Sequence, residues 1–411
     1  MRWLYTIGIV IYGSMIRLAS IWIAKAKLWV RGRKNILGIV ERDLKSNKYP
    51  IIWIHSASLG EFEQARPIIE ELKKQQPIFK ILVTFFSPSG YEIRKNYELA
   101  DFVYYLPEDT TQNARQFLKL VQPHLAIFVK YEFWYNYMQE LNLSKTPLIF
   151  ISAIFRHSQV FFQFYGGWFL KQLQNVDHIF VQTEESEKLL KEQGLSQVSL
   201  TGDTRFDRVV QIAKNASSVE IVERFKAGKK LFLGGSTWPD DERIIQGLQA
   251  KYTDIKMVIA PHLIDESHLL QIEKVFSNTI RYSKASIEKA KDHQVLIIDN
   301  MGMLSSLYQY ADFAMIGGGF GVGIHNTLEA ATFGMPIFIG PNYQKFQEAR
   351  DLIKLGVIKV INNEKEFVDI FEFYFRDSER TLEAKKQSLD YIRSKAGATD
   401  QIYQYIQQLL S

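Results

Sequence analysis

Short apolar runs that alternate with amphipathic stretches constrain the fold of this chain more than any other feature. The runs are shorter than a typical buried helix, and stretches with helical spacing of apolar residues, such as residues 62–74 and 185–192, lie between them. This alternation is typical of buried parallel strands that are connected by crossover helices. The first set of predicted strands comprises residues 51–55, 81–86, 125–131, 147–152, 178–181 and 198–201.

A second set of apolar runs follows a polar stretch, residues 211–230, which we interpret as a linker. From residue 364 onward the pattern is helical, and the chain ends in an amphipathic segment near residues 402–410. A chain of 411 residues with 46% hydrophobic content is large enough for two cores. The second set of predicted strands comprises residues 231–235, 257–260, 295–298, 313–316, 336–339 and 357–360.

These patterns predict an α/β fold with two Rossmann-like, doubly wound domains at residues 35–210 and 231–411. The segment before them, residues 1–34, predicts contact with a membrane. Residues 3–24 are apolar apart from Arg17, and a spanning helix needs about 20 such residues. Basic residues that follow an apolar segment stay on the cytoplasmic side, so we expect a membrane anchor with the protein body in the cytoplasm. The basic residues are Lys25, Lys27, Arg31, Arg33 and Lys34.

Arg17 leaves two alternatives to a spanning helix open, because a charge inside a bilayer is costly. The segment could lie in the plane of the membrane, with its aromatic residues at the level of the lipid head groups. It could also be an ordinary helix buried in a protein core. The aromatic residues concerned are Trp3, Tyr5, Trp22 and Trp29.

Composition excludes several classes of site. The chain has no cysteine, which rules out disulfides, thiolate metal sites and a cysteine nucleophile. Lysine and arginine number 50 against 45 acidic residues, which is too even to indicate a nucleic-acid partner. Neither an Asp-x-Asp motif nor ligand spacing of histidines is present, so we expect neither a metal nor a cofactor.

A glycine cluster follows the predicted strand at residues 313–316. Gly317, Gly318 and Gly319 would let backbone amides approach an anion, with a helix beginning near His325, and this order is typical of a phosphate site. The alternative is that the glycines only permit a tight turn.

Two polar residues lie next to this cluster. If the helix begins near His325, then His325 and Glu329 share one face of its first turns. Glu329 could accept hydrogen bonds from ribose hydroxyls, and Asn326 could donate one to a phosphate oxygen.

In the first domain, Glu61 is the candidate general base. It lies where the first strand ends and a helix begins, and Gly60 permits the turn between them. A carboxylate at that position could take a proton from a sugar hydroxyl. The alternative is that Glu61 only complements the helix dipole. A second carboxylate, Glu132, lies among aromatic residues, an environment that suits sugar binding.

Several polar residues are candidates for acceptor binding. Ser58 and Gly60 precede Glu61, while Thr84 and Ser87 lie at the second transition from strand to helix, where they could also be helix caps. Arg156 follows a later strand and could contact an acidic group.

Taken together and in order, these segments resemble the Kdo transferases of lipid A biosynthesis. That family moves 3-deoxy-D-manno-oct-2-ulosonic acid (Kdo) from CMP-Kdo to a lipid A precursor. The similarity covers nearly the whole chain, including the amino-terminal segment. The matching segments are residues 55–61 (HSASLGE), 84–90 (TFFSPSG), 105–110 (YLPEDT), 130–136 (KYEFWYN), 202–207 (GDTRFD), 234–242 (GGSTWPDDE), 299–304 (DNMGML) and 317–341.

The resemblance implies an inverting transfer without a metal, on a GT-B scaffold whose two domains face a central cleft. It implies that Glu61 is the general base and that Glu132 binds the acceptor or holds the site in shape. Ser236 and Thr237 fall on donor-binding segments, as do the glycine loop, Asn326 and Glu329. The implied partners are CMP-Kdo, a lipid A precursor and the cytoplasmic surface of the inner membrane.

The chain departs from the family at one donor-binding segment. The family usually has an Arg-His pair there, whereas this chain has Pro261 before His262. His262 and the glycine-loop amides would then have to contact the donor phosphate. Two other functions remain open: a different GT-B nucleotide-sugar transferase or epimerase acting on a cell-envelope precursor, and a GT-B scaffold at the membrane without catalytic activity.

Overall fold

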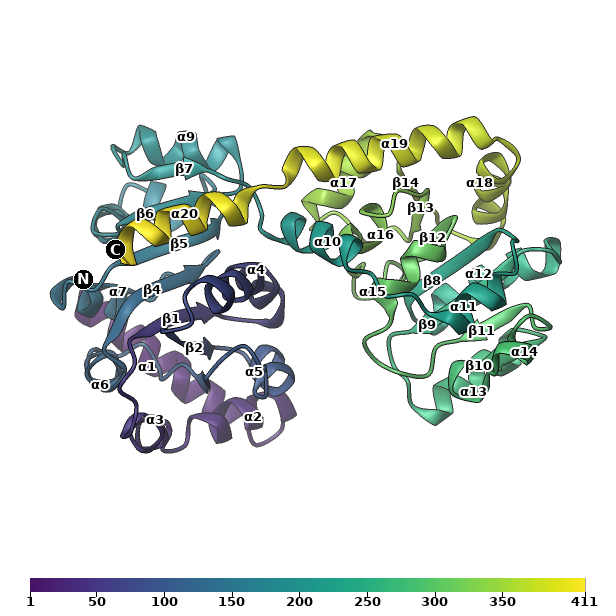
Figure 1. The fold of residues 1–411 in the computed structure, drawn as a ribbon. Coiled ribbons are helices and arrows are strands. Elements are labelled where there is room, and N and C mark those ends of the chain that lie inside the picture. Colours follow the sequence, from purple (N-terminus) through teal and green to yellow (C-terminus); the bar gives the residue numbers. More distant parts are fainter. Residues whose placement is uncertain (411) are drawn as a thin grey trace. The chain divides into compact units, whose positions relative to one another are not determined.

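The computed structural model describes residues 1–410, which form two compact units, each built on a parallel sheet (Figure 1). The amino-terminal unit comprises Met1–Asp207 together with the residues from Ala396 onward, and the carboxy-terminal unit comprises Arg208–Lys395. Residues 211–230 therefore lie within the carboxy-terminal unit, where they contain the end of α10 (Arg205–Lys214) and all of α11 (Glu220–Lys226).

The sheet of the amino-terminal unit has seven strands in the order β3-β2-β1-β4-β5-β6-β7, and every pair is parallel. The order reverses between β1 and β4, which is where open α/β sheets bind ligands. β3 was not predicted from the sequence; it is an edge strand whose first two residues are only half-buried. The strands are β1 (Ile51–Ser56), β2 (Lys80–Phe85), β3 (Phe102–Tyr105), β4 (Pro123–Val129), β5 (Leu148–Ala153), β6 (His178–Val181) and β7 (Val198–Leu200).

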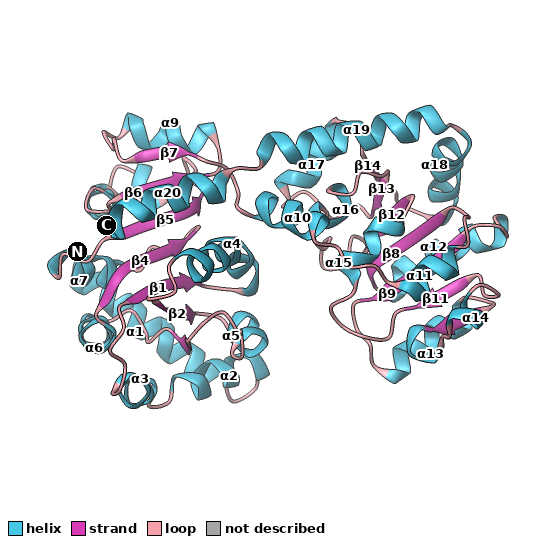
Figure 2. Cartoon of the chain, in the orientation of Figure 1, coloured by secondary structure: helices cyan, strands magenta, loops and turns pink. Residues whose placement is uncertain are grey.

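Helices follow the strands of this unit, as the ribbon coloured by secondary structure shows (Figure 2). The last helix of the chain, α20 (Ala398–Leu410), returns to this unit and packs beside α4. The other helices between the strands are α4 (Leu59–Gln75), α5 (Pro88–Arg94), α6 (Thr111–Val121), α7 (Tyr135–Leu143), α8 (Gly167–Leu173) and α9 (Glu184–Glu192).

The carboxy-terminal unit repeats this architecture, with a parallel sheet in the order β10-β11-β9-β8-β12-β13-β14. Its strands are β8 (Leu231–Thr237), β9 (Lys256–Pro261), β10 (Thr279–Arg281), β11 (Val295–Ile297), β12 (Phe313–Ile316), β13 (Ile337–Ile339) and β14 (Ile358–Val360). Its remaining helices are α12 (Pro239–Lys251), α13 (Glu266–Val275), α14 (Ile287–Ala290), α15 (Leu304–Leu307), α16 (Leu328–Ala331), α17 (Gln347–Lys354), α18 (Glu364–Arg376) and α19 (Ser378–Lys395). Both doubly wound domains predicted from the sequence are therefore present.

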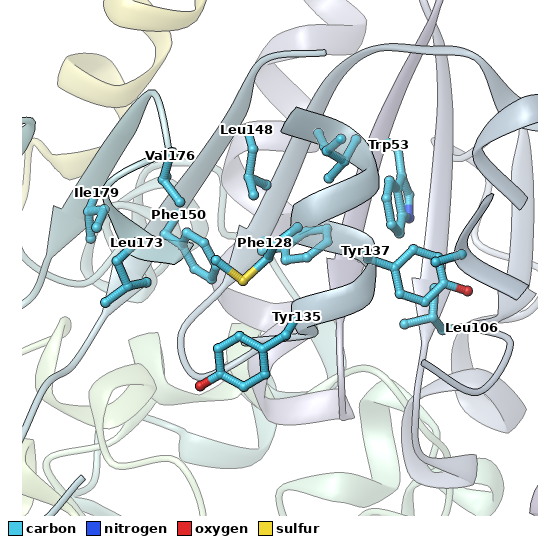
Figure 3. Packing of buried hydrophobic residues seen from close by; sticks show 14 of the residues in the cluster. Trp53, Leu106, Phe128, Tyr135, Tyr137, Leu148, Phe150, Leu173, Val176 and Ile179 are labelled. Carbon is cyan, nitrogen blue, oxygen red and sulfur yellow. The ribbon is translucent and has the colours of Figure 1, made fainter. Parts of the chain in front are cut away.

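Aromatic side chains fill the core on one face of the amino-terminal sheet (Figure 3). The Trp53 ring lies 5.0 Å from that of Phe128 and 5.5 Å from that of Tyr137, both in edge-to-face contact. Edge-to-face packing of this kind fixes ring orientation. The orientation of Trp53 matters because its indole N–H takes part in the candidate site described below.

The three amino-terminal helices, α1 (Arg2–Ala19), α2 (Ala24–Arg33) and α3 (Ile36–Leu44), pack against the amino-terminal unit. Arg2 pairs with Glu140 at 2.7 Å, and the Tyr5 hydroxyl donates to Asp109 at 2.6 Å. Because Tyr5 packs on Tyr135 and Trp29 is 4% exposed, neither ring is placed to contact lipid, contrary to the prediction for an in-plane helix.

The opposite face of α1 is apolar and exposed. Trp3 is 65% exposed, and the turn after the helix presents Trp22, which is 75% exposed. Among residues 1–410, none of the helices combines the length and the apolar character that crossing a bilayer requires. Other exposed apolar residues of this face are Leu4, Ile7, Ile11, Met15 and Leu18.

Candidate active site

Glu61 lies in the first turn of α4, at the carboxyl end of β1. Its Oε2 atom accepts hydrogen bonds from the backbone N–H and the hydroxyl of Ser58, both at 2.9 Å. This reciprocal contact is part of a capping box, which explains why the helix begins at this point. The second carboxylate oxygen, Oε1, has no hydrogen-bond partner among the described residues. Glu61 is therefore a helix cap with one free oxygen.

The second carboxylate, Glu132, lies close enough to influence Glu61. Burial raises the pKa of Glu61 above its usual value, and the negative charge of Glu132 raises it further. Lys130 and the hydrogen bonds from Ser58 oppose this rise. Lys130 has a positive φ of 66°, a conformation that non-glycine residues seldom adopt and that is common near functional sites. The two acidic residues predicted from the sequence thus form one site.

His55 holds Glu132 in place. Its Nε2 atom lies 3.0 Å from Glu132 Oε2, and the Trp134 indole donates to the same oxygen at 2.7 Å. His55 is fully buried and Glu132 is 6% exposed. Because side-chain torsions of a buried residue are limited by its neighbours, these two contacts restrict Glu132 to one orientation.

A chain of hydrogen bonds connects His55 to Thr84 and Trp53. The Trp53 indole donates to Thr84 Oγ1 at 2.8 Å, which leaves the Thr84 hydroxyl hydrogen free to be donated to His55 Nδ1, also at 2.8 Å. His55 Nδ1 also lies 3.2 Å from the Thr84 carbonyl oxygen, and the Trp134 indole lies within hydrogen-bond distance of both His55 Nε2, at 2.8 Å, and Glu132 Oε2. Sequence analysis did not identify His55 as a site residue. The available signal was a polar residue inside the buried strand β1, two positions after Trp53 and therefore on the same face of the sheet.

The residues predicted to bind the acceptor do not all lie where they could contact it. Ser58 contacts Glu61, and Gly60 is exposed, where a Cβ atom would lie 4.0 Å from the Ser58 hydroxyl oxygen. The Arg156 guanidinium lies 5.5 Å from the ring centre of Tyr131, which is a neighbour of Glu61, so this arginine belongs to the same region. Thr84 is fully buried and contributes through His55, because its hydroxyl is already used.

Ser87 is the N-cap of α5. Its hydroxyl oxygen accepts from the Ser89 N–H at 3.3 Å and contacts the Ser89 hydroxyl at 3.0 Å. This is the capping alternative that the sequence left open.

In the carboxy-terminal unit, the glycine loop packs tightly against other backbone. A Cβ atom on Gly317 would lie 2.3 Å from the carbonyl oxygen of Ser236, and one on Gly319 would lie 2.6 Å from the Gly340 amide nitrogen. The Gly317 amide donates to Gly235 and the Gly318 amide to Asp241 Oδ2, each at 2.9 Å. These glycines are therefore required by packing within the unit, and two of their amides are already used.

The prediction of a helix beginning near His325 is wrong. Residues 320–326 form turns and irregular backbone, and α16 begins at Leu328. The reason is that the loop folds back on the strand ends, with the His325 amide donating to Gly317 and the Ile324 amide donating to Asn342. His325 and Glu329 therefore do not share a helix face.

Asn326 and Glu329 nevertheless meet. The Asn326 amide group donates to Glu329 Oε1 at 3.0 Å, while its oxygen accepts from the Leu328 N–H at the start of α16. The Ser305 hydroxyl donates to Glu329 Oε2 at 2.6 Å. Ser305 was not predicted, and its two partners fix the carboxylate of Glu329 at the start of a short helix.

Three aromatic rings are stacked beside the glycine loop. His262 lies between the rings of Trp238 and His325, with centroid distances of 4.9 and 4.4 Å. The Trp238 indole donates to His325 Nε2 at 3.1 Å, so this nitrogen carries no proton. Burial and the neighbouring His262 lower the pKa of His325 to about 4, and burial lowers the pKa of His262. Both histidines are neutral at pH 7.

Ser236 and Thr237 lie at the end of β8. Ser236 has a positive φ of 53°, which turns the chain toward α12. Thr237 is fully buried, its hydroxyl donates to Glu242 at 2.9 Å, and its carbonyl oxygen accepts from the His262 amide, so its side chain is not available to a ligand.

Asp241 connects α12 to the glycine loop and was also missed by sequence analysis. Its Oδ2 atom accepts from the Gly318 amide, and its buried Oδ1 atom has no partner. Burial raises the pKa of Asp241 to about 6. The sequence feature that could have identified Asp241 is its position at N3 of a helix, shortly after a strand that has two adjacent glycines near its end. Across residues 1–410, no group of three or more His, Asp and Glu side chains is arranged to hold a metal ion.

Comparison with known proteins identifies the relatives of this chain. A model of the family described as "3-Deoxy-D-manno-octulosonic-acid transferase (kdotransferase)" matches residues 31–208. The 3-deoxy-D-manno-octulosonic acid transferase of Rickettsia bellii is 26% identical over 399 residues, which cover 91% of this chain and 93% of the relative. That of Aquifex aeolicus is 27% identical and covers 77% of this chain and 84% of the relative.

This chain is a homologue of the Kdo transferases. The family match covers most of the amino-terminal unit, including His55, Glu61 and Glu132, while the full-length relatives extend the similarity into the carboxy-terminal unit. The resemblance inferred from the ordered motifs is confirmed.

Solved structures confirm the fold. The UDP-GlcNAc 2-epimerase of Neisseria meningitidis has a TM-score of 0.59 at 15% identity and covers 87% of this chain and all of the epimerase. The MurG protein of Acinetobacter baumannii has a TM-score of 0.55 at 11% identity, with 88% and 99% coverage. At these identities the likeness concerns the α/β fold alone, and the Kdo transferase relatives distinguish among its functions.

Proposed function

We propose that this protein is a Kdo transferase that moves Kdo from CMP-Kdo to a lipid A precursor. The match to the Rickettsia bellii relative carries the proposal, because it spans 91% of this chain and therefore both units. A chain retained only as a scaffold would have no need for a free, half-buried carboxylate oxygen beside a second oriented carboxylate.

Glu61 is the proposed general base. The acceptor hydroxyl approaches the free Oε1 atom and transfers its proton there while its oxygen bonds to the anomeric carbon of Kdo. The bond from that carbon to the CMP phosphate breaks, CMP leaves with the electron pair, and attack from the opposite face inverts the configuration. The raised pKa of Glu61 makes it a stronger base than an exposed glutamate.

Glu132 is proposed to orient the acceptor rather than to take the proton. Its Oε2 atom is occupied by His55 and Trp134, which leaves Oε1 to accept a hydrogen bond from a sugar hydroxyl. Arg156 would contact an anionic group of the acceptor.

The carboxy-terminal unit is proposed to hold CMP-Kdo. Glu329, fixed by Asn326 and Ser305, presents a carboxylate to the ribose hydroxyls. The backbone of Ser236 and Thr237 and the remaining loop amides meet the phosphate, together with His262. The leaving phosphate is already stable as an anion, so the proposed reaction needs no metal.

The protein is further proposed to work at the cytoplasmic surface of the inner membrane. The exposed apolar face of α1 together with the basic residues of α2 is typical of a helix that lies in the membrane plane. Such a position would bring the lipid acceptor to the amino-terminal unit.

Purified protein incubated with CMP-Kdo and a tetraacylated lipid A precursor tests the proposal. Mass spectrometry should detect product that is heavier by one or more Kdo units. The matched reaction with UDP-GlcNAc should give no glycosylated product and no epimer. Failure to modify the lipid with CMP-Kdo, or turnover of UDP-GlcNAc instead, would overturn the proposal.

A further inference from the structure

A cavity of about 920 Å³ lies in the amino-terminal unit, between the first three helices and the loop that follows β3. Its wall includes Ser20, Trp29, Ile36 and Pro107, and none of the residues that line it belongs to the pair Glu61 and Glu132. Pockets that bind small molecules typically have volumes of roughly 300 to 1,000 Å³. The proposed transfer reaction does not use this cavity.

The cavity wall is strongly basic. Five basic residues line it against two carboxylates, Glu41 and Glu108, and Glu108 is already paired with Arg17. Lys27, Arg31 and Lys34 form no ion pair with any other residue in the part of the chain that the structure describes. The five basic residues are Arg17, Lys27, Arg31, Arg33 and Lys34.

Arg33 is the fixed cation of this cavity. Its guanidinium donates to the carbonyl oxygens of Leu106 at 2.9 Å and Phe86 at 2.8 Å, and it lies 3.9 Å from the centre of the Trp29 ring. No carboxylate is bonded to it. Burial lowers the pKa of Arg33 to about 9, although the charge of Glu108, which lines the same cavity, opposes this shift. A half-buried cation that no carboxylate contacts directly favours the binding of an anion.

The rim of the cavity is apolar and exposed. Ser20 lines the cavity, and the next three residues, Ile21, Trp22 and Ile23, are 67%, 75% and 55% exposed. A basic pocket beside exposed large apolar residues matches the layered chemistry of a membrane surface, where phosphate lies next to hydrocarbon.

We propose that this cavity binds the phosphate of an anionic phospholipid head group, held by Arg31, Arg33 and Lys34, while Ile21, Trp22 and Ile23 enter the lipid layer. The proposal rests on the proposed membrane association, but it does not depend on Kdo transfer. It assigns a specific lipid site to a surface that would otherwise bind membranes through diffuse charge alone.

Vesicle sedimentation separates a site from diffuse charge. Arg31 and Lys25 are both exposed residues of α2, but only Arg31 lines the cavity. A single basic residue near an anionic surface contributes about a fivefold effect through charge alone. We therefore expect Lys25→Gln to weaken binding to phosphatidylglycerol vesicles by no more than about fivefold, and Arg31→Gln to weaken it by well over about tenfold.

Three results would overturn the proposal. Equal losses for the two variants would indicate diffuse charge, and equal binding of wild type to phosphatidylcholine vesicles would indicate that the anion is irrelevant. Release of the protein by inorganic phosphate at the concentration of lipid phosphate would indicate a site for the free ion. Because both side chains are exposed, circular dichroism should show wild-type folding for both variants. Since vesicle binding requires no CMP-Kdo, failure of the transfer reaction would leave this test unaffected.

Discussion

Glu61 combines two roles at one residue, because one carboxylate oxygen caps α4 and the other is free. We expect Glu61→Gln to lower the rate of Kdo transfer by at least about a hundredfold, since glutamine accepts the same hydrogen bonds from Ser58 but cannot take a proton. Initial rates of product formation would measure the loss. Urea unfolding should show little change, and a variant that keeps most of its activity would exclude Glu61 as the base.

The pH dependence of transfer should report the charge of Glu132. Burial and Glu132 raise the pKa of Glu61, so the base is protonated, and kcat/KM falls, as the pH decreases through a value above that of an ordinary glutamate. Glu132→Gln removes the repelling charge, and the acidic limb of the profile should therefore move to lower pH. An unchanged limb in a variant with measurable activity would show that the two carboxylates do not interact.

The hydrogen-bond chain behind Glu132 gives a further prediction. Thr84→Val keeps the shape of the side chain but leaves the buried Trp53 N–H without a partner, and it leaves His55 Nδ1 with only the backbone carbonyl oxygen of residue 84 at 3.2 Å. We expect a loss of about 1–3 kcal/mol in the free energy of unfolding together with reduced transfer. Thr84→Ser, which keeps the hydroxyl, should restore most of both. If Thr84→Val matched wild type in both measurements, the chain would have no positioning role.

The sequence predicted the residues that a ligand would contact better than the residues that support them. Glu61 and Glu132 follow strand ends, a position that pattern analysis can find. His55 and Asp241 act through contacts between segments far apart in the chain, with Glu132 and Gly318 respectively. The spacing of residues along the sequence does not reveal such contacts. The only indication in the sequence is a polar residue in a buried segment.

At the scale of elements, local composition predicted the central strands and two of the four edge strands, and it failed at the other two edges and in one loop. β12 and β6 were predicted to the residue, because all their side chains except His178, the half-buried first residue of β6, are apolar and buried. The edge strands β3 and β10 were missed, whereas the edge strands β7 and β14, which are equally short and half-exposed, were predicted; β10 contains only one apolar residue, Ile280. The helix expected near His325 is absent because tertiary hydrogen bonds from the loop to the strand ends replace its first turn.

Helix α20 contributes stability to a unit that is distant from it in sequence. Ile406 is fully buried in the core formed with β1, β2 and β4. Ile406→Ala should lower the free energy of unfolding of the amino-terminal unit by about 2–5 kcal/mol. Hydrogen exchange should show faster exchange in β1 and β4 than in β8 and β12. The exposed neighbour Gln407→Ala should have almost no effect, and uniform loss of protection in both sheets would contradict the assignment.

At the scale of the whole molecule, the proposal that the carboxy-terminal unit holds CMP-Kdo predicts which unit a nucleotide stabilises. CMP at about 100 times its dissociation constant should add about 2.7 kcal/mol to stability, and UDP much less. Hydrogen exchange should place the added protection within Arg208–Lys395. Stronger stabilisation by UDP, or protection confined to the amino-terminal unit, would contradict the assignment of the donor site.

The chain passes from one unit to the other at Asp207 and returns at Ala396, so the carboxy-terminal unit is inserted into the amino-terminal one. During synthesis, the first sheet emerges from the ribosome long before the helix that covers part of it. The core that contains Ile149, Ile151 and Phe180 is completed only after α20 has been synthesised. A nascent chain stalled before Ala396 would therefore expose apolar surface that molecular chaperones can bind. Packing of α20 against this surface would then displace the chaperones.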